Sequence, residues 1–255
     1  MNRSSTSGGG AGDPYTAVRA ARGNWPEQSF LRSLDHDLLR ELSEAGELME
    51  FPRTRALAVE GSSATDVYLL LSSCVKVTSR LPGGGDALLA VRVGGDVIGE
   101  LAALDRKPRS ATVTACGNTP VEAIRVARQD FFDILTARPQ VLLQLSMAVA
   151  EKLRTSTRRR IDYRSAKPLV RLARVLTEMA DDHGTAPYGR STVIGVDLTQ
   201  VEWGTLIGVS GRTVEREISR LREQGLIAKG PGRITVLDMA GLRTLAHPTG
   251  GGAGG

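Results

Sequence analysis

The sequence contains few of the residues that most metal and redox sites need. It has two cysteines, Cys74 and Cys116, and three histidines, His36, His183 and His247. Two cysteines cannot build the disulfide framework that stabilises small secreted proteins, and an iron–sulfur cluster takes about four. We therefore expect reduced thiols in a cytoplasmic protein and no iron–sulfur cluster. Composition does not exclude haem, but no histidine lies in the strand-rich segment or in the long helical segment described below, so we expect no metal.

Long apolar runs are also missing. No stretch approaches the roughly 20 apolar residues that span a bilayer, and the first residues, MNRSSTSGGGAGDP, lack the apolar core of a signal peptide. We find no Ser/His/Asp set, no metal-ligand spacing and no Walker motif in the sequence. The sequence thus predicts a protein that is not exported, does not enter a membrane and is not an enzyme.

What is present is a chain of 255 residues, long enough for two domains with separate cores. Its 41% hydrophobic content is that of a folded protein rather than a disordered one. The net charge of +5 is compatible with a nucleic-acid partner, but a slightly basic protein without such a partner has the same sum. The position of the positive charges therefore matters more than their total.

The two ends of the chain differ in composition from the rest. Residues 1–23 are rich in Ser, Gly, Ala and Arg, and residues 248–255 are mostly Gly, so we expect disordered tails. Between them, the segment SFLRSLDHDLLRELSEAG places leucines at spacings of three and four residues. This period predicts a helix that ends at Gly46.

The period then changes to two, which is typical of strands. The candidate strand segments, separated by Gly, Pro and Asn turns, are ELMEFPRTRALAVEG, DVYLLLSSCVKVTSR, ALLAVRVGGDVIGE, SATVTACG and VEAIRVAR. Short strands joined by tight turns predict a small antiparallel barrel or roll. No alternation of strands with helices is found, so a Rossmann-type parallel sheet is disfavoured.

A long helical segment follows the strands. It breaks at Pro139 and then runs without Pro or Gly to Ala166. A coiled-coil-like seam with alternating spacings of three and four comprises Leu142, Leu145, Val149, Lys152 and Ser156. Because the seam turns polar midway, we interpret the segment as a dimerisation helix that meets a polar group there. A seam that frays into solvent explains the pattern equally well.

The C-terminal part resembles a helix-turn-helix followed by a wing. Pro168 marks its start, and LVRLARVLTEMADDHG predicts a helix that ends at Gly184, followed by a loop to Val196. Two further helices, within DLTQVEWGTLIGVSGRTVEREISRLREQGLI, are joined by a tight turn at GVS. Asp197 or Thr199 is the expected cap of the first, and Ser210 of the second. The segment LIAKGPGRITVLD predicts a two-stranded wing.

The second of these helices has the charge pattern of a recognition helix. Val214, Ile218 and Leu221 form its apolar face, and between residues 211 and 233 six basic and three acidic residues leave a charge of +3. The first turn of a recognition helix reaches base edges, and arginine reads guanine with two hydrogen bonds. The residues that we expect to contact DNA are Thr199, Gln200, Ser210, Gly211, Arg212, Thr213, Arg216 and Arg220. A solvated helical hairpin is the weaker interpretation, because it does not explain the wing.

The segment GGDVIGELAALDRKPRSATVTA has the composition of an anion pocket. Its glycines allow a ligand to approach the backbone. Arg109 provides a planar fork for phosphate oxygens, and Ser110 adds a hydroxyl and an N–H. Glu100 can accept hydrogen bonds from the hydroxyls of a ribose. An ordinary ion pair between Glu100 and Arg109 on a surface loop is the competing interpretation.

This segment resembles the phosphate-binding cassette of cyclic-nucleotide-binding domains, through Gly99-Glu100-Leu101 and Arg109-Ser110-Ala111. From about residue 42 to 245 the chain is similar to the CRP/FNR family of bacterial transcription regulators. The resemblance implies an α+β fold with three parts. These are a cyclic-nucleotide-binding-type antiparallel β-roll (24–137), a dimerisation helix and hinge (138–166), and a winged helix-turn-helix domain (167–247).

The resemblance also implies roles for individual residues. Arg109 and Ser110 would hold the cyclic phosphate and Glu100 the ribose hydroxyl, within a cassette that includes Gly99 and Leu101. The positions near the purine correspond to Lys152, Ser156 and Thr157. Here Lys152 replaces the arginine of cyclic-AMP-binding members, the order of the two hydroxyl residues is exchanged, and Ser73 stands where a turn glycine is usual.

The expected effector is cyclic AMP or a related cyclic nucleotide, and the expected partners are a two-fold operator in double-stranded DNA, a second copy of the chain and RNA polymerase. Two alternatives stay open: a cyclic dinucleotide as effector, or a degenerate pocket in a roll that only dimerises or contacts polymerase. The operator-reading pattern Arg-Glu-x-x-x-Arg of cyclic-AMP-type members corresponds here to Gly211, Arg212 and Arg216. We therefore predict a different half-site.

Overall fold

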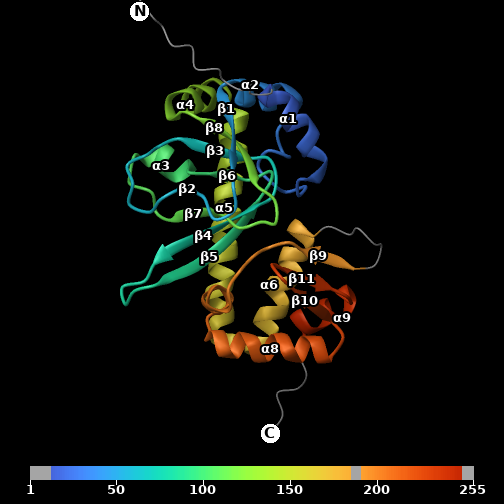
Figure 1. The fold of residues 1–255 in the computed structure, drawn as a ribbon. Helices are drawn as coiled ribbons and strands as arrows, with labels where there is room; N and C mark the ends of the chain where they lie inside the picture. The colour runs from blue at the N-terminus through green and yellow to red at the C-terminus, as the bar shows by residue number, and fades with distance from the viewer. Residues whose placement is uncertain (1–12, 185–190, 249–255) are drawn as a thin grey trace, which may run out of the picture.

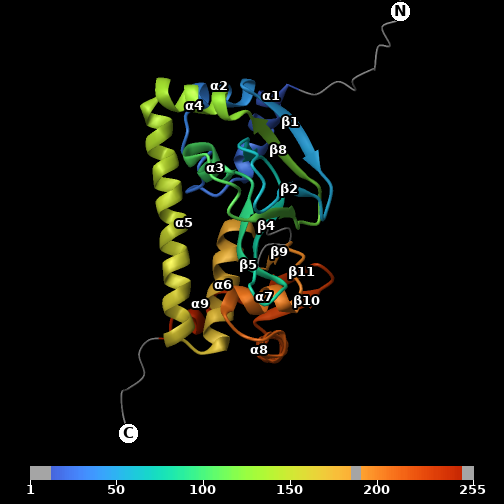
Figure 2. The same cartoon turned by 90° about the vertical axis from the view of Figure 1, so that its left-hand side faces the viewer.

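The structure is a computed structural model that describes residues 13–184 and 191–248. An N-terminal β-roll and a C-terminal helical unit lie along one long helix, α5, as the two views in Figures 1 and 2 show. The parts of the predicted tails at residues 1–12 and 249–255 lie outside the described residues. In the part of the chain that is described, no helix is both long and apolar enough to cross a membrane.

The N-terminal tail prediction is wrong for the residues that follow Asp13. They form the helix α1 (Pro14–Ala21) and the short 3₁₀ helix η1 (Arg22–Asn24). The carboxylate of Asp13 caps α1 by accepting backbone N–H groups of its first turn, and Val18 is buried in the core of the roll. A local cap and the apolar contacts centred on Val18 therefore order a segment whose composition is that of a tail.

The predicted helix before Gly46 is half as long as expected. The helix α2 runs over His36–Glu44, and Asp35 caps it by accepting the N–H of Leu38 at 2.9 Å. Residues 29–34 form turns instead, although their apolar side chains are still buried. The cap explains the difference, because an aspartate at this position starts a new helix rather than continuing one.

The strand predictions are confirmed as an antiparallel roll of two sheets. One sheet has the order β1 (Gly46–Phe51), β8 (Val121–Val126), β3 (Val67–Leu70), β6 (Val97–Ile98). The other has the order β2 (Ala56–Ala58), β7 (Thr112–Ala115), β4 (Cys74–Arg80), β5 (Asp86–Val93). All pairings within both sheets are antiparallel. The turn residue Ser73 has φ +59°, a conformation that favours glycine, and its hydroxyl donates to the carbonyl of Thr119 at 2.9 Å.

The predicted break at Pro139 separates α4 (Arg128–Ala137) from α5 (Pro139–Ser165), which is 27 residues long. The residues of the predicted seam differ in burial along α5. Leu145 is 1% exposed and packs in the core of the roll, whereas Leu142 is 44% exposed. One apolar stripe of α5 packs against the roll. The exposed large apolar residues of the helix include Leu142, Leu143, Met147, Leu153 and Ile161.

The C-terminal unit contains the predicted helix-turn-helix and wing. Its helices are α6 (Pro168–His183), α7 (Gln200–Ile207), α8 (Gly211–Glu223) and α9 (Met239–Ala246). Its sheet has the order β10 (Ile227–Gly230), β11 (Arg233–Val236), β9 (Thr192–Ile194). The strand β9 corrects the loop predicted up to Val196, because residues 192–194 pair with β11 and extend the wing.

The roll and the C-terminal unit are docked directly on each other. One hydrophobic core joins Cys74, Leu88 and Val91 of the roll to Trp203 and Leu206 of α7. Figure 2 shows α7 lying against β5. The N–H of Leu88 donates to the Thr205 hydroxyl at 2.9 Å, and Lys76 of β4 forms an ion pair with Glu202. A change in the roll can therefore act on the C-terminal unit through this interface as well as through α5.

Candidate ligand pocket and nucleic-acid interface

The predicted cassette folds as a tight turn into the short helix α3 (Glu100–Asp105). Gly99 precedes it with φ +85°, and a Cβ atom at this position would lie 2.2 Å from Nη1 of Arg109 and 2.8 Å from the carbonyl oxygen of Asp66. Only glycine fits this space and this conformation. The turn thus brings the Arg109 guanidinium against the start of α3.

Arg109 is almost entirely buried, at 5% exposure. Its Nη1 donates to the carbonyl of Gly99 at 3.0 Å, and its Nη2 donates to the carbonyl of Asp66. Its buried Nε–H has no hydrogen-bond partner among residues 13–184 and 191–248. Burial lowers the pKa of Arg109, while the nearby Tyr68, Asp66 and Glu100 oppose this effect. A buried donor without a partner is costly, so this site favours an acceptor, and an anion in particular.

Glu100 is also buried, at 6% exposure, but it does not pair with Arg109. Its Oε1 accepts a hydrogen bond from Nζ of Lys152 on α5 at 2.8 Å, and Nζ also donates to the carbonyl of Val97 at 2.8 Å. The ion pair expected in the competing interpretation, Glu100 with Arg109, is not formed. The structure instead brings Gly99, Glu100, Arg109 and Lys152 together, and Lys152 ties α5 to the cassette.

The other predicted pocket residues are exposed and make no side-chain hydrogen bond to this cluster within the described residues. Leu101 is 47% exposed on α3, and Ser110, Ser156 and Thr157 are exposed as well. Within the described part of the chain, the hydroxyls of Ser110, Ser156 and Thr157 make no hydrogen bond to a cassette residue. Their roles in ligand binding stay predictions.

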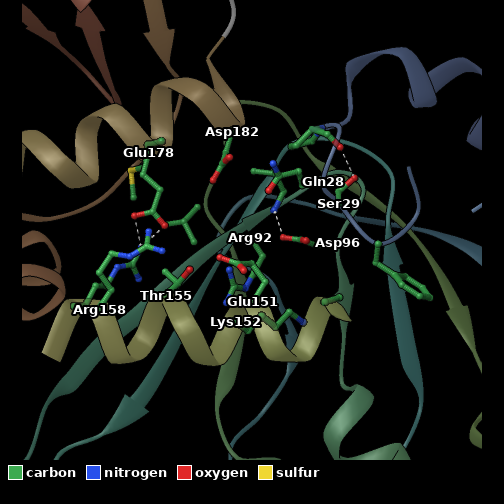
Figure 3. Close-up of a pocket in the computed structure, with 17 residues that line it drawn as sticks. Gln28, Ser29, Arg92, Asp96, Glu151, Lys152, Thr155, Arg158, Glu178 and Asp182 are labelled. Carbon is green, nitrogen blue, oxygen red and sulfur yellow. Dashed lines mark hydrogen bonds and ion pairs between the residues drawn. The ribbon is translucent and has the colours of Figure 1, made fainter. Parts of the chain in front are cut away.

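A cavity of about 230 Å³ lies where the roll, α5 and α6 meet (Figure 3). Lys152 lines this cavity and also bonds to Glu100, whereas Glu100 and Arg109 are not among the lining residues. Arg159 of α5 forms two hydrogen bonds of 3.1 Å with Glu178 of α6 at its wall. Partial desolvation, followed by the neighbouring carboxylates Glu178 and Asp96, raises the pKa of Asp182 to about 6, although the residue keeps contact with solvent. The contact between roll and α6 is therefore incompletely packed and holds several carboxylates close together.

The helix-turn-helix is built by local caps, as predicted. Thr199 caps α7 in a capping box with Glu202, and the Ser210 hydroxyl caps α8 by accepting the N–H of Thr213 at 3.2 Å. Gly208 forms the turn with φ +70°. The Tyr163 ring of α5 lies against this glycine, and its hydroxyl donates to the Leu206 carbonyl at 2.8 Å. The end of α5 therefore fixes the turn between the two helices.

The helix α8 lies at the outer edge of the C-terminal unit (Figure 1). Its predicted apolar face, Val214, Ile218 and Leu221, is buried. The predicted contact residues gather at the N-terminal ends of α7 and α8 and along the opposite side of α8, and the side chains of Arg212, Arg216 and Arg220 are exposed. This surface presents arginines and helix N-termini together, the groups that bind phosphates and base edges.

Sequence reasoning missed Glu217, which is 2% exposed on α8. It forms ion pairs with Arg216 at 2.8 Å and with Arg220 at 2.9 Å. Its position was the available signal, because it lies three residues after Val214 and four before Leu221, on the apolar face.

Comparison with known proteins agrees with both halves of this structure. The model of the cyclic nucleotide-binding domain family matches residues 48–138, and that of the Crp-like helix-turn-helix domain matches residues 170–245. The CRP-like cAMP-activated global transcriptional regulator of Mycobacterium tuberculosis is 28% identical over 78% of this chain and 87% of its own. The cyclic AMP receptor protein of Thermus thermophilus is 26% identical over 77% of this chain and 86% of its own.

Among solved structures, FixK2 from Bradyrhizobium japonicum has a TM-score of 0.66 at 20% identity and covers 80% of this chain and 99% of its own. A CRP-family transcriptional regulator from Thermus thermophilus has a TM-score of 0.64 at 24% identity and covers 78% and 96%. Fold and site together define a DNA-binding transcription regulator with a cyclic-nucleotide-binding domain. The chain belongs to the CRP/FNR family.

Proposed function

We propose that the protein is a homodimeric regulator whose binding to a two-fold operator is controlled by a cyclic nucleotide, held in the roll against α5. The observation that carries this proposal is the buried Arg109, whose Nε–H lacks an acceptor within the described residues. The relatives from M. tuberculosis and T. thermophilus are named for cyclic AMP, which makes cyclic AMP the first effector to test.

The residues present fit such an effector. Arg109 supplies a guanidinium for the cyclic phosphate, with Ser110 beside it in the sequence, and Glu100 supplies an acceptor for the ribose hydroxyl. Glu100 is bonded to Lys152, so a ligand hydroxyl would compete with α5 for the same carboxylate. Ligand binding would therefore change how α5 is tied to the roll.

The signal has two routes to the helix-turn-helix. The first is α5 itself, because Tyr163 near its end bonds to α7 and Asp162 pairs with Arg174 of α6. The second is the direct contact of β4 and β5 with α7. A ligand that prefers one arrangement of these contacts would shift the population of dimers able to place both copies of α8 on DNA.

The exposed apolar residues of α5 support a dimer. Leu143, Met147 and Leu153 are 61%, 57% and 67% exposed. Large apolar side chains on one helix are costly in water, and a second copy of the helix would cover them. Contact with RNA polymerase remains a prediction from the family resemblance.

The test is titration of the purified protein with cyclic AMP, cyclic GMP and cyclic dinucleotides, followed by calorimetry and by thermal melting. We expect heat and a higher melting temperature with a cyclic nucleotide, both lost in Arg109→Ala while dimerisation persists. Arg106→Ala is the matched control, because Arg106 is exposed in the same loop. An equal response in Arg109→Ala would contradict the assigned site, and loss of folding in that variant would show that Arg109 is structural.

One observation favours a second candidate, a regulator that needs no ligand. Lys152 already satisfies Glu100, and two donor groups of Arg109 are already bonded to the Gly99 and Asp66 carbonyls. A pocket closed in this way could serve only to hold α5. No heat and no melting shift with any of these nucleotides, together with DNA binding by the unliganded protein, would establish this alternative.

A further inference from the structure

The carboxylate of Glu217 lies inside the helix-turn-helix although it belongs to the recognition helix. Its side chain is 2% exposed, whereas the side chains of its two partners, Arg216 and Arg220, are 65% and 53% exposed. Oε1 accepts hydrogen bonds from Nε of Arg216 at 3.0 Å and from Nη2 of Arg216 at 2.8 Å. Oε2 accepts one from Nη1 of Arg220 at 2.9 Å. Both oxygens are thus committed to arginines.

Stability of the fold does not explain this arrangement. The position lies on the face of α8 that buries Val214, Ile218 and Leu221, where an apolar residue would pack. Burying a carboxylate carries a desolvation penalty, and well-packed apolar residues in place of buried ion pairs are often neutral or stabilising. Residues adjacent in sequence also do not face each other on a helix, so Arg216 must bend back across α8 to reach Glu217.

The chemistry of the guanidinium indicates what the contact does. Arginine has two hydrogen-bonding faces: a side face formed by Nε and one terminal nitrogen, and an end face formed by the two terminal nitrogens. Glu217 occupies the side face of Arg216. The Nη1 group of Arg216 has no partner among the residues that the structure describes, so the end face stays available. The two terminal nitrogens of this face can donate together to O6 and N7 of guanine.

We infer that Glu217 is a positioning residue that holds Arg216 in the conformation that reads one base of the operator, with Arg220 as a second tethered cation. This inference rests on the proposed recognition of a two-fold operator by α8. Free arginine side chains lose rotamer entropy when they bind, and a tethered one loses less. The negative charge of Glu217 weakens the nonspecific attraction of α8 for DNA. In return, the contact increases the discrimination between bases.

The experiment compares base preferences of the full-length wild type, Glu217→Gln and Glu217→Leu. Each protein selects bound duplexes from a random library, and its affinity for the wild-type sequence and for an unrelated duplex is measured at fixed salt. We expect both variants to fold and to lose roughly tenfold in preference at a single position of each half-site, the discrimination that one bidentate contact supplies. Binding to the unrelated duplex should be equal or tighter, since a negative charge is removed.

Glu215→Gln is the matched control. Glu215 is exposed on the same helix, so this variant makes the same change of charge without touching the tether. It should alter binding to the unrelated duplex as Glu217→Gln does, with unchanged base preferences. Base preferences in Glu217→Gln and Glu217→Leu equal to those of the wild type would overturn the inference, as would an equal loss of affinity for both duplexes.

Failure of the wild type to enrich any sequence would overturn the proposed operator recognition, and the role of Glu217 with it. Enrichment by the wild type with unchanged preferences in the variants would overturn the role of Glu217 alone. Replacement of Arg216 by Ala completes the comparison, because its loss of preference should fall at the same position as that of Glu217→Gln.

Discussion

Replacement of Lys152 by Met tests how strongly α5 is tied to the cassette. The change keeps most of the apolar length of the side chain but removes the ammonium group. Glu100 would then lose its 2.8 Å partner, and the carbonyl of Val97 would lose a donor. The carboxylate would be left in a site where the side chain of Glu100 is only 8% exposed.

The exposed fractions of the Glu100 and Lys152 side chains determine how much free energy of unfolding the substitution removes. Exposed ion pairs contribute about 0–1 kcal/mol, and breaking a buried pair costs about 3–5 kcal/mol. With exposures of 8% and 20%, the Glu100–Lys152 pair lies nearer the buried limit. After allowance for water at Lys152, we expect Lys152→Met to lower the free energy of unfolding by about 2–3 kcal/mol.

The assay is a double-mutant cycle of Lys152→Met and Glu100→Gln, measured by urea unfolding at pH 7.5. The double variant should lose less than the sum of the single variants, with a coupling energy of about 1.5–2 kcal/mol. Glu151 and Arg154 form the matched control pair on the same helix, at 3.0 Å but with exposures of 52% and 65%. Their coupling should stay below about 0.5 kcal/mol. Equal coupling in the two pairs would refute the reasoning.

Two further predictions concern association and pH. Leu153→Ala should weaken dimerisation about 30-fold, because about 1 kcal/mol of apolar burial is lost from each of two copies. Sedimentation measures this, with the exposed Leu237→Ala as control, and an unchanged dissociation constant would contradict the proposed interface. The raised pKa of Asp182, about 6, means that the folded state holds this proton more tightly than the unfolded one. The stabilisation that the protonated Asp182 carboxyl gives to the folded state is present below about pH 4 and is lost as the pH rises through 6. Asp182→Asn should therefore melt above the wild type at pH 7.5 and converge with it in acid, whereas parallel melting curves would exclude this role.

The sequence alone determined the features that depend on near neighbours. The caps at Thr199 and Ser210, the turn at Gly208 and the alternation of the roll strands involve residues a few positions apart, so their patterns are readable before folding. The cassette was recognised for the same reason, since Gly99-Glu100-Leu101 and Arg109-Ser110-Ala111 form one short segment. Among local features, the tail prediction over α1 and the length of α2 were wrong, because single caps at Asp13 and Asp35 outweighed composition and period.

Only the tertiary structure decided which charged groups meet. Sequence reasoning placed Glu100, Arg109 and Lys152 in one pocket, but it did not show which of them form ion pairs. Glu100 and Lys152 are 52 residues apart in the sequence, so their ion pair depends on how α5 packs against the roll. In the same packing Leu145 is buried in the core and Leu153 is exposed. The helical period of the sequence does not show which of these two leucines is buried. Burial of Glu217 likewise results from the neighbours of α8, because the free energy of a buried charge is set by what surrounds it in space rather than by what adjoins it in sequence.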